Sequence, residues 1–202
     1  MRYLAFASAL ALLAACGQTP ATSTTTTSTA EQTAPAALPP APMTQVSLAD
    51  FVEKAAITDM FEVEAGRLAA QRTRVAAIRH FAQQMVREHT ATTNELKRTL
   101  ASVQSAPTPP TALDQEHQQK LTDLRNAAAD RFDEIYLDQQ TQAHEQGLQL
   151  LRDYAERGDN AAVQQFASQT APKVEQHLTM VRELDRGGAD EQAQAMEKEK
   201  KT

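Results

Sequence analysis

Apolar residues recur every three to four positions from about residue 47 to residue 184, and the alternation that is typical of strands is missing. The repeats fall into four long segments, about 47–72, 75–103, 130–157 and 161–184, and one short segment at about 113–125. Ser47 offers an N-cap to the first segment, and Asp50 places negative charge in its first turn. The pattern therefore predicts five helices, four of them long and amphipathic.

The connections between these segments carry turn and loop residues. Residues 105–111 contain three prolines and must form a loop, since proline lacks a backbone donor and restricts the residue before it. Residues 158–160 read Gly-Asp-Asn, a C-cap glycine followed by an N-cap, and Gly187 with Gly188 predicts the end of the fold. Together these features predict an all-α antiparallel four-helix bundle, with an extra short helix in the connection between the second and third long helices.

The first 15 residues have a different character. One positive charge at Arg2 is followed by a short apolar run and then by small residues up to Cys16. This is the layout of a secretory signal peptide. The run is shorter than the roughly 20 apolar residues that a membrane-spanning helix needs, so we do not expect it to be a permanent anchor.

Leu13-Ala14-Ala15-Cys16 resembles the lipobox of bacterial lipoproteins. The resemblance implies that the thiol of Cys16 receives a diacylglycerol, that the signal is cut just before it, and that the new amine is acylated. Two or three acyl chains suffice for stable membrane attachment. Because Gly17 is not Asp, the resemblance also implies an outer-membrane destination. We expect a lipid-anchored protein of the bacterial cell envelope, held in the membrane through Cys16, with its domain facing the periplasm.

The sequence divides into four parts. Residues 1–15 are the expected lipoprotein signal peptide, and residues 16–46 hold the lipidated Cys16 and a disordered tether rich in Thr, Ala and Pro. Residues 47–186 form the expected helical bundle, and residues 187–202 are a charged flexible tail.

Charge restricts the partners that we expect, and the cysteine content restricts how the domain can be stabilised. The chain has a formal net charge of −6, and it contains no basic patch interleaved with aromatics, so we do not expect nucleic acid as a partner. The acidity also argues against electrostatic attraction to anionic lipids, which leaves the acyl chains as the membrane attachment. With one cysteine the chain cannot form an internal disulfide, and packing must stabilise the domain.

Several segments, in order and with similar spacing, resemble one known family. They begin with Glu62-Val63-Glu64-Ala65-Gly66-Arg67-Leu68-Ala69 and continue with Phe81-Ala82-Gln83-Gln84-Met85-Val86-Arg87-Glu88-His89, Phe132-Asp133-Glu134-Ile135-Tyr136-Leu137, His144-Glu145 and Pro172-Lys173-Val174-Glu175-Gln176-His177-Leu178. The set resembles the bacterial "domain of unknown function 4142" family of exported proteins, often described as outer-membrane proteins. The resemblance implies a ferritin-like helical bundle over about residues 48–184 and assigns no biochemical role.

Three histidines on different long helices fall on apolar faces. His89 shares a face with Met85 and Leu96, His144 with Leu148 and Leu151, and His177 with Val174 and Val181. The helical spacing thus predicts that all three point into the bundle. His80 falls on a mostly polar face, and His117 on the short helix remains ambiguous.

The first long helix can add a carboxylate to these imidazoles. Glu62 lies on a small-residue face with Ala65, Gly66 and Asp59, and Glu64 lies on a face with Leu68, so we expect one of the two to point inward. A buried carboxylate needs a positive partner or a metal nearby. Imidazoles with a carboxylate suit Zn, Cu, Ni or Fe.

A di-iron site of the ferritin type is not expected. Such sites use Glu-x-x-His on two helices, because that spacing puts both ligands on one face, and the chain has no such motif. Glu88 and Glu175 each neighbour a histidine in sequence, but adjacent helical residues diverge by about 100°. Each is therefore interpreted as a solvated charge or a salt-bridge partner.

These features leave three hypotheses for the function. The first is a non-enzymatic binding or structural module that contacts an envelope protein or a small ligand, in which the histidines form a buried polar network. The alternative is a mononuclear metal-binding protein with His89, His144, His177 and Glu62 or Glu64 as ligands to a divalent transition metal. A ferritin-like oxidoreductase is a more distant alternative. The sequence assigns no catalytic residue and no certain cofactor, and we expect no enzymatic activity.

Overall fold

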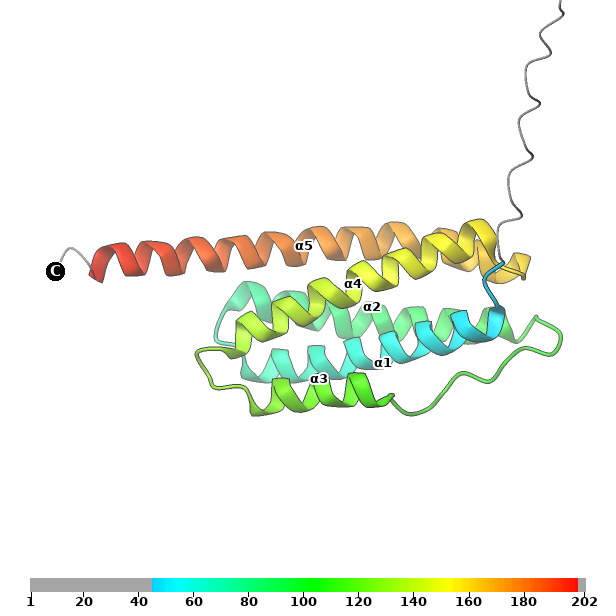
Figure 1. Ribbon diagram of the computed structural model, residues 1–202, viewed down its shortest axis with the longest axis horizontal. Helices are drawn as coiled ribbons and strands as arrows, with labels where there is room; N and C mark the ends of the chain where they lie inside the picture. Colours follow the sequence, from blue (N-terminus) through cyan, green and yellow to red (C-terminus); the bar gives the residue numbers. More distant parts are fainter. Residues whose placement is uncertain (1–44, 200–202) are drawn as a thin grey trace, which may run out of the picture. The chain divides into compact units, whose positions relative to one another are not determined.

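The computed structural model describes residues 45–199 and the side chains of residues 45–187. Five helices make up this part of the chain (Figure 1): α1 (Leu48–Arg72), α2 (Ala76–Leu100), α3 (Gln115–Asn126), α4 (Phe132–Arg157) and α5 (Ala161–Glu199). The signal peptide, Cys16 and most of the tether lie outside the described residues. In the described region we find no helix with the length and apolarity required to cross a membrane.

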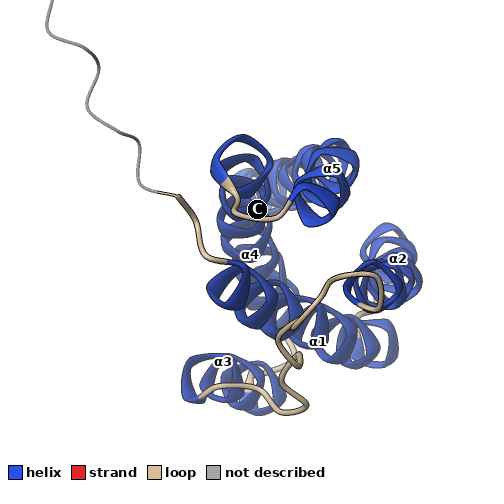
Figure 2. Ribbon diagram, turned by 90° about the vertical axis from the view of Figure 1, so that its right-hand side faces the viewer, coloured by secondary structure: helices blue, strands red, loops and turns tan. Residues whose placement is uncertain are grey.

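The four long helices form a closed ring of contacts. α1 packs against α2 and α4, and α5 packs against α4 and α2, so each helix has two neighbours (Figure 2). α3 lies outside this ring against α1 and α4. The structure thus confirms the predicted four-helix bundle with an additional short helix in the connection between α2 and α4.

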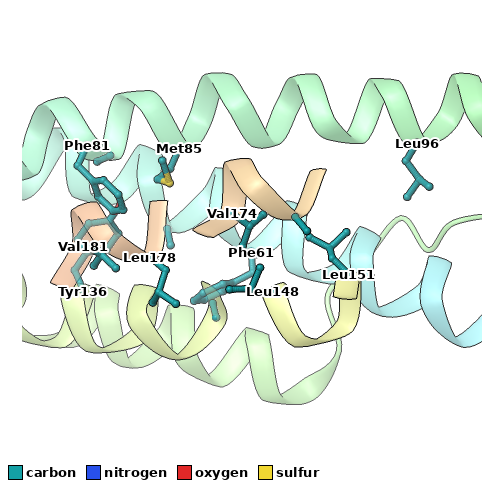
Figure 3. Close-up of a cluster of buried hydrophobic side chains, with 14 of the residues drawn as sticks. Phe61, Phe81, Met85, Leu96, Tyr136, Leu148, Leu151, Val174, Leu178 and Val181 are labelled. Atoms are coloured by element: carbon teal, nitrogen blue, oxygen red, sulfur yellow. The ribbon is translucent and has the colours of Figure 1, made fainter. Parts of the chain in front are cut away.

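The interior of the bundle is filled by the apolar stripes that the periodicity predicted (Figure 3). Phe61 from α1, Met85 from α2, Tyr136 from α4 and Val181 from α5 are buried together with their neighbours. At the end of the bundle where α1 begins, the ring of Phe51 lies 4.2 Å from that of Tyr154. This packing leaves the polar residues of each stripe without access to bulk water.

Arg72 attaches the short helix to the bundle. Its guanidinium donates hydrogen bonds of 2.7, 2.8 and 2.7 Å to the backbone oxygens of Leu124, Arg125 and Ala127, at the end of α3. The last carbonyls of a helix have no partner within the helix, so a cation there stabilises it. The same guanidinium lies 4.3 Å from the centre of the Phe132 ring, at the start of α4.

The end of α5 differs from the prediction. The glycine pair was expected to end the fold, but α5 continues without interruption to Glu199. Each glycine inside a helix costs about 1 kcal/mol relative to alanine, which is a penalty and not a stop. The residues that follow are mostly Ala, Glu, Gln, Met and Lys, which favour helix. The prediction that the helix ends before Gly187 is therefore wrong.

Gly66 allows α1 and α2 to approach closely. A Cβ atom at this position would lie 2.9 Å from the backbone oxygen of Ala82 and 3.0 Å from Cγ2 of Val86. Backbone cannot move aside as easily as the end of a long side chain. The separation of the two helices is thus fixed by the absence of a side chain at Gly66.

This contact predicts opposite effects for alanine at two helical glycines. Gly66→Ala should lower the free energy of unfolding by about 1–2 kcal/mol, because overpacking outweighs the gain in helix propensity. Gly147→Ala should raise it by up to about 1 kcal/mol, since a Cβ there meets nothing closer than Thr58 Cγ2 at 3.9 Å. Urea unfolding followed by circular dichroism measures both. Stabilisation by Gly66→Ala would contradict the close approach.

Candidate metal centre

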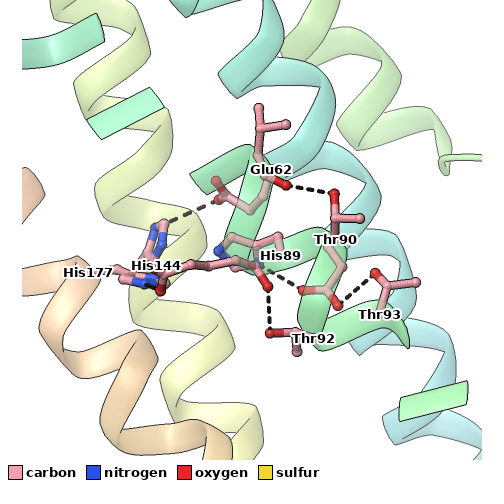
Figure 4. A network of polar contacts seen from close by, with 10 residues as sticks. Glu62, His89, Thr90, Thr92, Thr93, His144 and His177 are labelled. Atoms are coloured by element: carbon pink, nitrogen blue, oxygen red, sulfur yellow. Dashed lines mark hydrogen bonds and ion pairs between the residues drawn. The ribbon is translucent and has the colours of Figure 1, made fainter. Parts of the chain in front are cut away.

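The three inward histidines come together in the middle of the bundle (Figure 4). His89 from α2, His144 from α4 and His177 from α5 are 5%, 2% and 3% exposed. Their ring centroids lie 5.5 Å apart for His89 and His144, 5.6 Å for His89 and His177, and 5.4 Å for His144 and His177. The structure thus brings all three to the same height along the bundle.

One ring nitrogen of each histidine donates a hydrogen bond away from the cluster. Nδ1 of His89 donates to Oδ1 of Asp59 over 2.8 Å, and Nδ1 of His144 donates to the backbone oxygen of Gln140 over 2.8 Å. Nε2 of His177 donates to Oε2 of Glu88 over 2.6 Å. Each acceptor oxygen fixes the position of the ring proton and the orientation of the imidazole.

The second nitrogen of each ring has no hydrogen-bond partner among the described residues. These atoms are Nε2 of His89, Nε2 of His144 and Nδ1 of His177, and all three are buried. One ring nitrogen from each histidine lies within 4.8 Å of the others. In a neutral imidazole whose other nitrogen carries the proton, the remaining nitrogen has a free lone pair. When all three rings are neutral, the arrangement therefore offers three buried lone pairs in a small volume.

The two candidate glutamates of α1 take different positions. Glu62 is buried, and its Oε1 lies 3.7 Å from Nδ1 of His144. Glu64 is exposed and forms an ion pair of 3.3 Å with Arg125 of α3. Of the two predicted carboxylates, the structure brings only Glu62 to the histidines, and Glu64 is a surface residue.

A group of buried polar atoms adjoins the histidines on the side of α1 and α4. Within the part of the chain that the structure describes, both carboxylate oxygens of Glu62, the hydroxyl of Tyr136 and the side-chain amide of Gln140 lack a hydrogen-bond partner. Tyr136, Gln140 and His144 follow one another at four-residue spacing and form a polar line along α4. Buried polar atoms without a hydrogen-bond partner destabilise the fold. Where a native structure retains them, a functional role is a common reason.

Burial and neighbouring charge shift the pKa values of these groups in opposite directions. Burial raises the pKa of Glu62 to about 7, although the nearby His89 opposes the rise. Burial lowers the pKa of His144 to about 3, and the charge of His89 lowers it further. Burial also raises the pKa of Tyr136, and the charge of Glu62 adds to this. His144 is consequently neutral at physiological pH.

At the other two rings, the carboxylates that accept hydrogen bonds oppose the effect of burial on the pKa. Burial alone would lower the pKa of His89, but the hydrogen bond and charge of Asp59 raise it overall. The pKa of His177 is lowered because its burial outweighs the hydrogen bond to Glu88. Burial would raise the pKa of Glu88, but its hydrogen bond to His177 lowers it overall.

The other two histidines lie elsewhere. His80 is exposed on α2, as predicted. His117 donates from Nδ1 to Asp114 over 2.7 Å and packs edge-on against Phe61, with the ring centroids 5.2 Å apart. It borders a surface cavity of about 340 Å³ between α1, α3 and α4, and another cavity of about 330 Å³ lies between α4 and α5. Neither is lined by the three clustered histidines.

Two residues that contact the histidines, Asp59 and Glu88, were not predicted to belong to the site. Asp59 was noted on the face of Glu62 but was given no role, and it holds His89 while its Oδ2 accepts from Thr93 over 3.0 Å. Glu88 was interpreted as a solvated charge or salt-bridge partner, and it pairs with His177 from another helix. Glu175, interpreted in the same way, forms an ion pair of 2.7 Å with Arg152.

The family model described as "Domain of unknown function (DUF4142)" matches residues 30–184. The chain belongs to this family. The match spans α1 to α4 and most of α5, so the DUF4142 domain of this chain includes all residues of the candidate metal centre. The predicted family is thereby confirmed. No curated protein matches the chain.

A solved structure resembles this DUF4142 chain in its fold. It is "CopM in the Cu(II)-bound form", with a TM-score of 0.60 and 14% sequence identity. The alignment covers 71% of this chain and 98% of the CopM chain. At this identity the likeness establishes a common helical fold and nothing about individual residues.

Proposed function

We propose that this protein binds one divalent transition-metal ion through His89, His144 and His177, and that Cu(II) is its preferred ion. The proposal rests on the different surroundings of the two nitrogens within each imidazole. One nitrogen is fixed by an acceptor from the protein, and the other is buried without a partner among the described residues. One ring nitrogen of each histidine also lies within 4.8 Å of one from each of the other two. Outer acceptors of this kind are characteristic of histidines that ligate metals.

The distances are compatible with a shared ion. Nitrogen ligands lie about 2.0–2.1 Å from zinc, so two of them on a tetrahedral ion are about 3.3 Å apart. In the structure, one nitrogen from each of the three rings lies within 4.8 Å of the others. Small rotations of the three side chains are enough to close this difference. A purely structural network would instead be expected to use both nitrogens of each ring.

The charges around the centre favour a dication. Asp59 and Glu88 accept hydrogen bonds from two of the ligands, and the carboxylate of Glu62 is close to a third. A doubly charged ion compensates more of this negative charge than Cu(I) does. Imidazole suits zinc, copper and nickel, and among divalent ions copper binds such sites most strongly. The resemblance to a protein solved with Cu(II) supports the same choice.

The cellular setting is a proposal that rests on the sequence. We place the protein in the bacterial envelope, attached to the outer membrane through acyl chains on Cys16, with the bundle in the periplasm. We further propose that it binds the ion without catalysing a reaction, because the sequence contains no Glu-x-x-His pair and no other catalytic signature. An envelope protein or a small ligand would then be its partner.

Metal titration of the untagged full-length chain tests the proposal. After treatment with a chelator, the protein is titrated with Cu(II) or Zn(II), and the bound metal is measured by mass spectrometry. We expect one ion per chain. His89→Ala should remove this binding, because it deletes one of three ligands.

His80→Ala is the matched control, since it removes an exposed histidine from the same helix. It should bind metal like the wild type. The proposal would be wrong if the wild-type chain retained no metal, or if the variants at positions 80 and 89 behaved alike.

A further inference from the structure

The metal centre is enclosed on the sides of α1 and α4. Asp59 and Glu62 of α1 are buried, as are Tyr136 and Gln140 of α4. Met85, one turn before His89 on α2, is also fully buried. An ion that enters through any of these sides would have to displace packed side chains.

Glu88 is different, because it contacts both water and a histidine of the centre. Its side chain is 41% exposed, whereas the side chain of its partner His177 is 4% exposed. Glu88 lies on α2 and His177 on α5, so this ion pair lies between two neighbouring helices. The carboxylate is thus open to bulk solvent and at the same time contacts a buried imidazole over 2.6 Å.

Asp59 provides an internal comparison. It also accepts a hydrogen bond from a clustered histidine, but its side chain is only 8% exposed. Both of its oxygens are engaged, one by His89 and the other by Thr93. Asp59 can therefore orient a ligand but is poorly placed to meet an ion from solution.

We infer that divalent cations enter and leave the centre between α2 and α5, and that Glu88 is the residue that first attracts them. This inference rests on the proposed function. The cation is attracted by the exposed carboxylate, the hydrogen bond between Glu88 and His177 opens, and the ring of His177 is then free to turn toward the ion. No covalent bond changes, and the hydrogen bond reforms once the ion lies among the three imidazoles.

The expected contribution of one carboxylate is large for a dication. A charge of −1 and a charge of +2 separated by about 5 Å in water attract each other by about 1.7 kcal/mol, which corresponds to more than tenfold in local concentration. Salt screens this attraction over a Debye length of about 10 Å at 0.1 M. An entry role for Glu88 therefore predicts an association rate that depends on ionic strength.

Stopped-flow measurements on the full-length chain test this role. The chain has three tyrosines and no tryptophan, and Cu(II) that binds near buried Tyr136 should quench their fluorescence. Glu88→Gln keeps an oxygen that can accept a hydrogen bond from Nε2 of His177 but removes the charge. We expect it to lower the association rate constant about tenfold at low salt and much less at high salt. Because ions enter and leave by the same path, release should slow as well, and the dissociation constant should change less than the association rate constant.

Three further variants separate entry from positioning. Asp59→Asn should weaken affinity about 10- to 100-fold through faster release, with little change in association. Glu145→Gln removes the same charge from an exposed residue paired with Arg182, and it should leave both rates unchanged. Glu88→Asp keeps the charge and should restore most of the association rate.

The outcomes distinguish the two proposals. An association rate of Glu88→Gln equal to that of the wild type, with release accelerated as in Asp59→Asn, would overturn the entry role and leave metal binding intact. Equal slowing by Glu88→Gln and Glu145→Gln would also overturn it, because overall charge would then explain the effect. Absence of metal binding by the wild-type chain would overturn both.

Discussion

Replacing His144 with alanine is expected to abolish the gain in thermal stability that Cu(II) gives the wild-type chain. A ligand that binds the folded state alone stabilises it by about 2.7 kcal/mol when its free concentration is 100 times the dissociation constant. For a chain of this size, the melting temperature should rise by about 5–10 °C. Differential scanning fluorimetry with and without metal measures this gain.

His144 is the most informative ligand to remove. It is the most buried of the three histidines, and its low pKa keeps it neutral, so no proton has to leave before the metal binds. Without it, two imidazoles remain, and the gain should fall to about 1 °C or less.

The matched control for this variant is Leu148→Ala. Leu148 lies one turn further along the same face of α4 and is buried, but it offers no ligand. Both substitutions should destabilise the metal-free fold by about 2–5 kcal/mol, because each leaves a cavity. The Leu148 variant should nevertheless keep the full metal-dependent gain. If the His144 variant kept the gain as well, His144 would not be a ligand.

Much of the fold could be predicted because helical periodicity is a local property. The apolar neighbours of His89, such as Met85 and Leu96, lie three to seven residues away, so the sequence alone places this histidine on an inward face. The same reasoning succeeded for His144 and His177. It failed for the end of α5, where a glycine pair was interpreted as a stop although the residues after it favour helix.

The meeting of the three imidazoles could not be predicted in this way. Whether residues of α2, α4 and α5 lie at the same height depends on how the helices slide along one another, and loops and packing set this. Periodicity gives the direction of a side chain but not its position along the bundle axis.

The hydrogen-bond acceptors of the histidines could not be predicted from the sequence for a related reason. Glu88 and His177 are 89 residues apart, and only the packing of α2 against α5 brings them together. Asp59 gave a weak signal, as a second acid on the small-residue face of Glu62. A pair of acids three residues apart on an inward face can be recognised in a sequence, but the ring that each of them meets cannot.

Glu62→Gln is expected to stabilise the metal-free protein and to weaken metal binding. In the metal-free chain, burial raises the pKa of Glu62 from 4.5 to about 7. The folded chain therefore keeps this proton to a higher pH than the unfolded chain does. Between pH 4.5 and about 7 the folded state binds more protons, so its stability falls as the pH rises through this window.

The size of this change in stability follows from the pKa shift of Glu62. A difference of about 2.5 pH units corresponds to about 3 kcal/mol, all of it lost above the folded-state pKa. Glutamine has nearly the same shape as the protonated acid but never ionises. The metal-free Glu62→Gln variant should thus match the wild type near pH 4.5 and exceed it by up to about 3 kcal/mol at pH 8. Urea unfolding at both pH values, in the presence of a chelator, measures the difference.

In the presence of metal, Glu62→Gln should be unfavourable instead of favourable. The ionised carboxylate that destabilises the empty bundle is attracted to a dication among the three imidazoles, so its loss should raise the dissociation constant at pH 8. A buried acid that served only the fold would have the opposite signature, because its replacement would be neutral or harmful at every pH and indifferent to metal. Stabilisation without metal, combined with weaker binding of metal, is the pattern expected of a residue retained for the ion. Destabilisation of the metal-free variant by the same amount at both pH values would show that Glu62 serves packing alone.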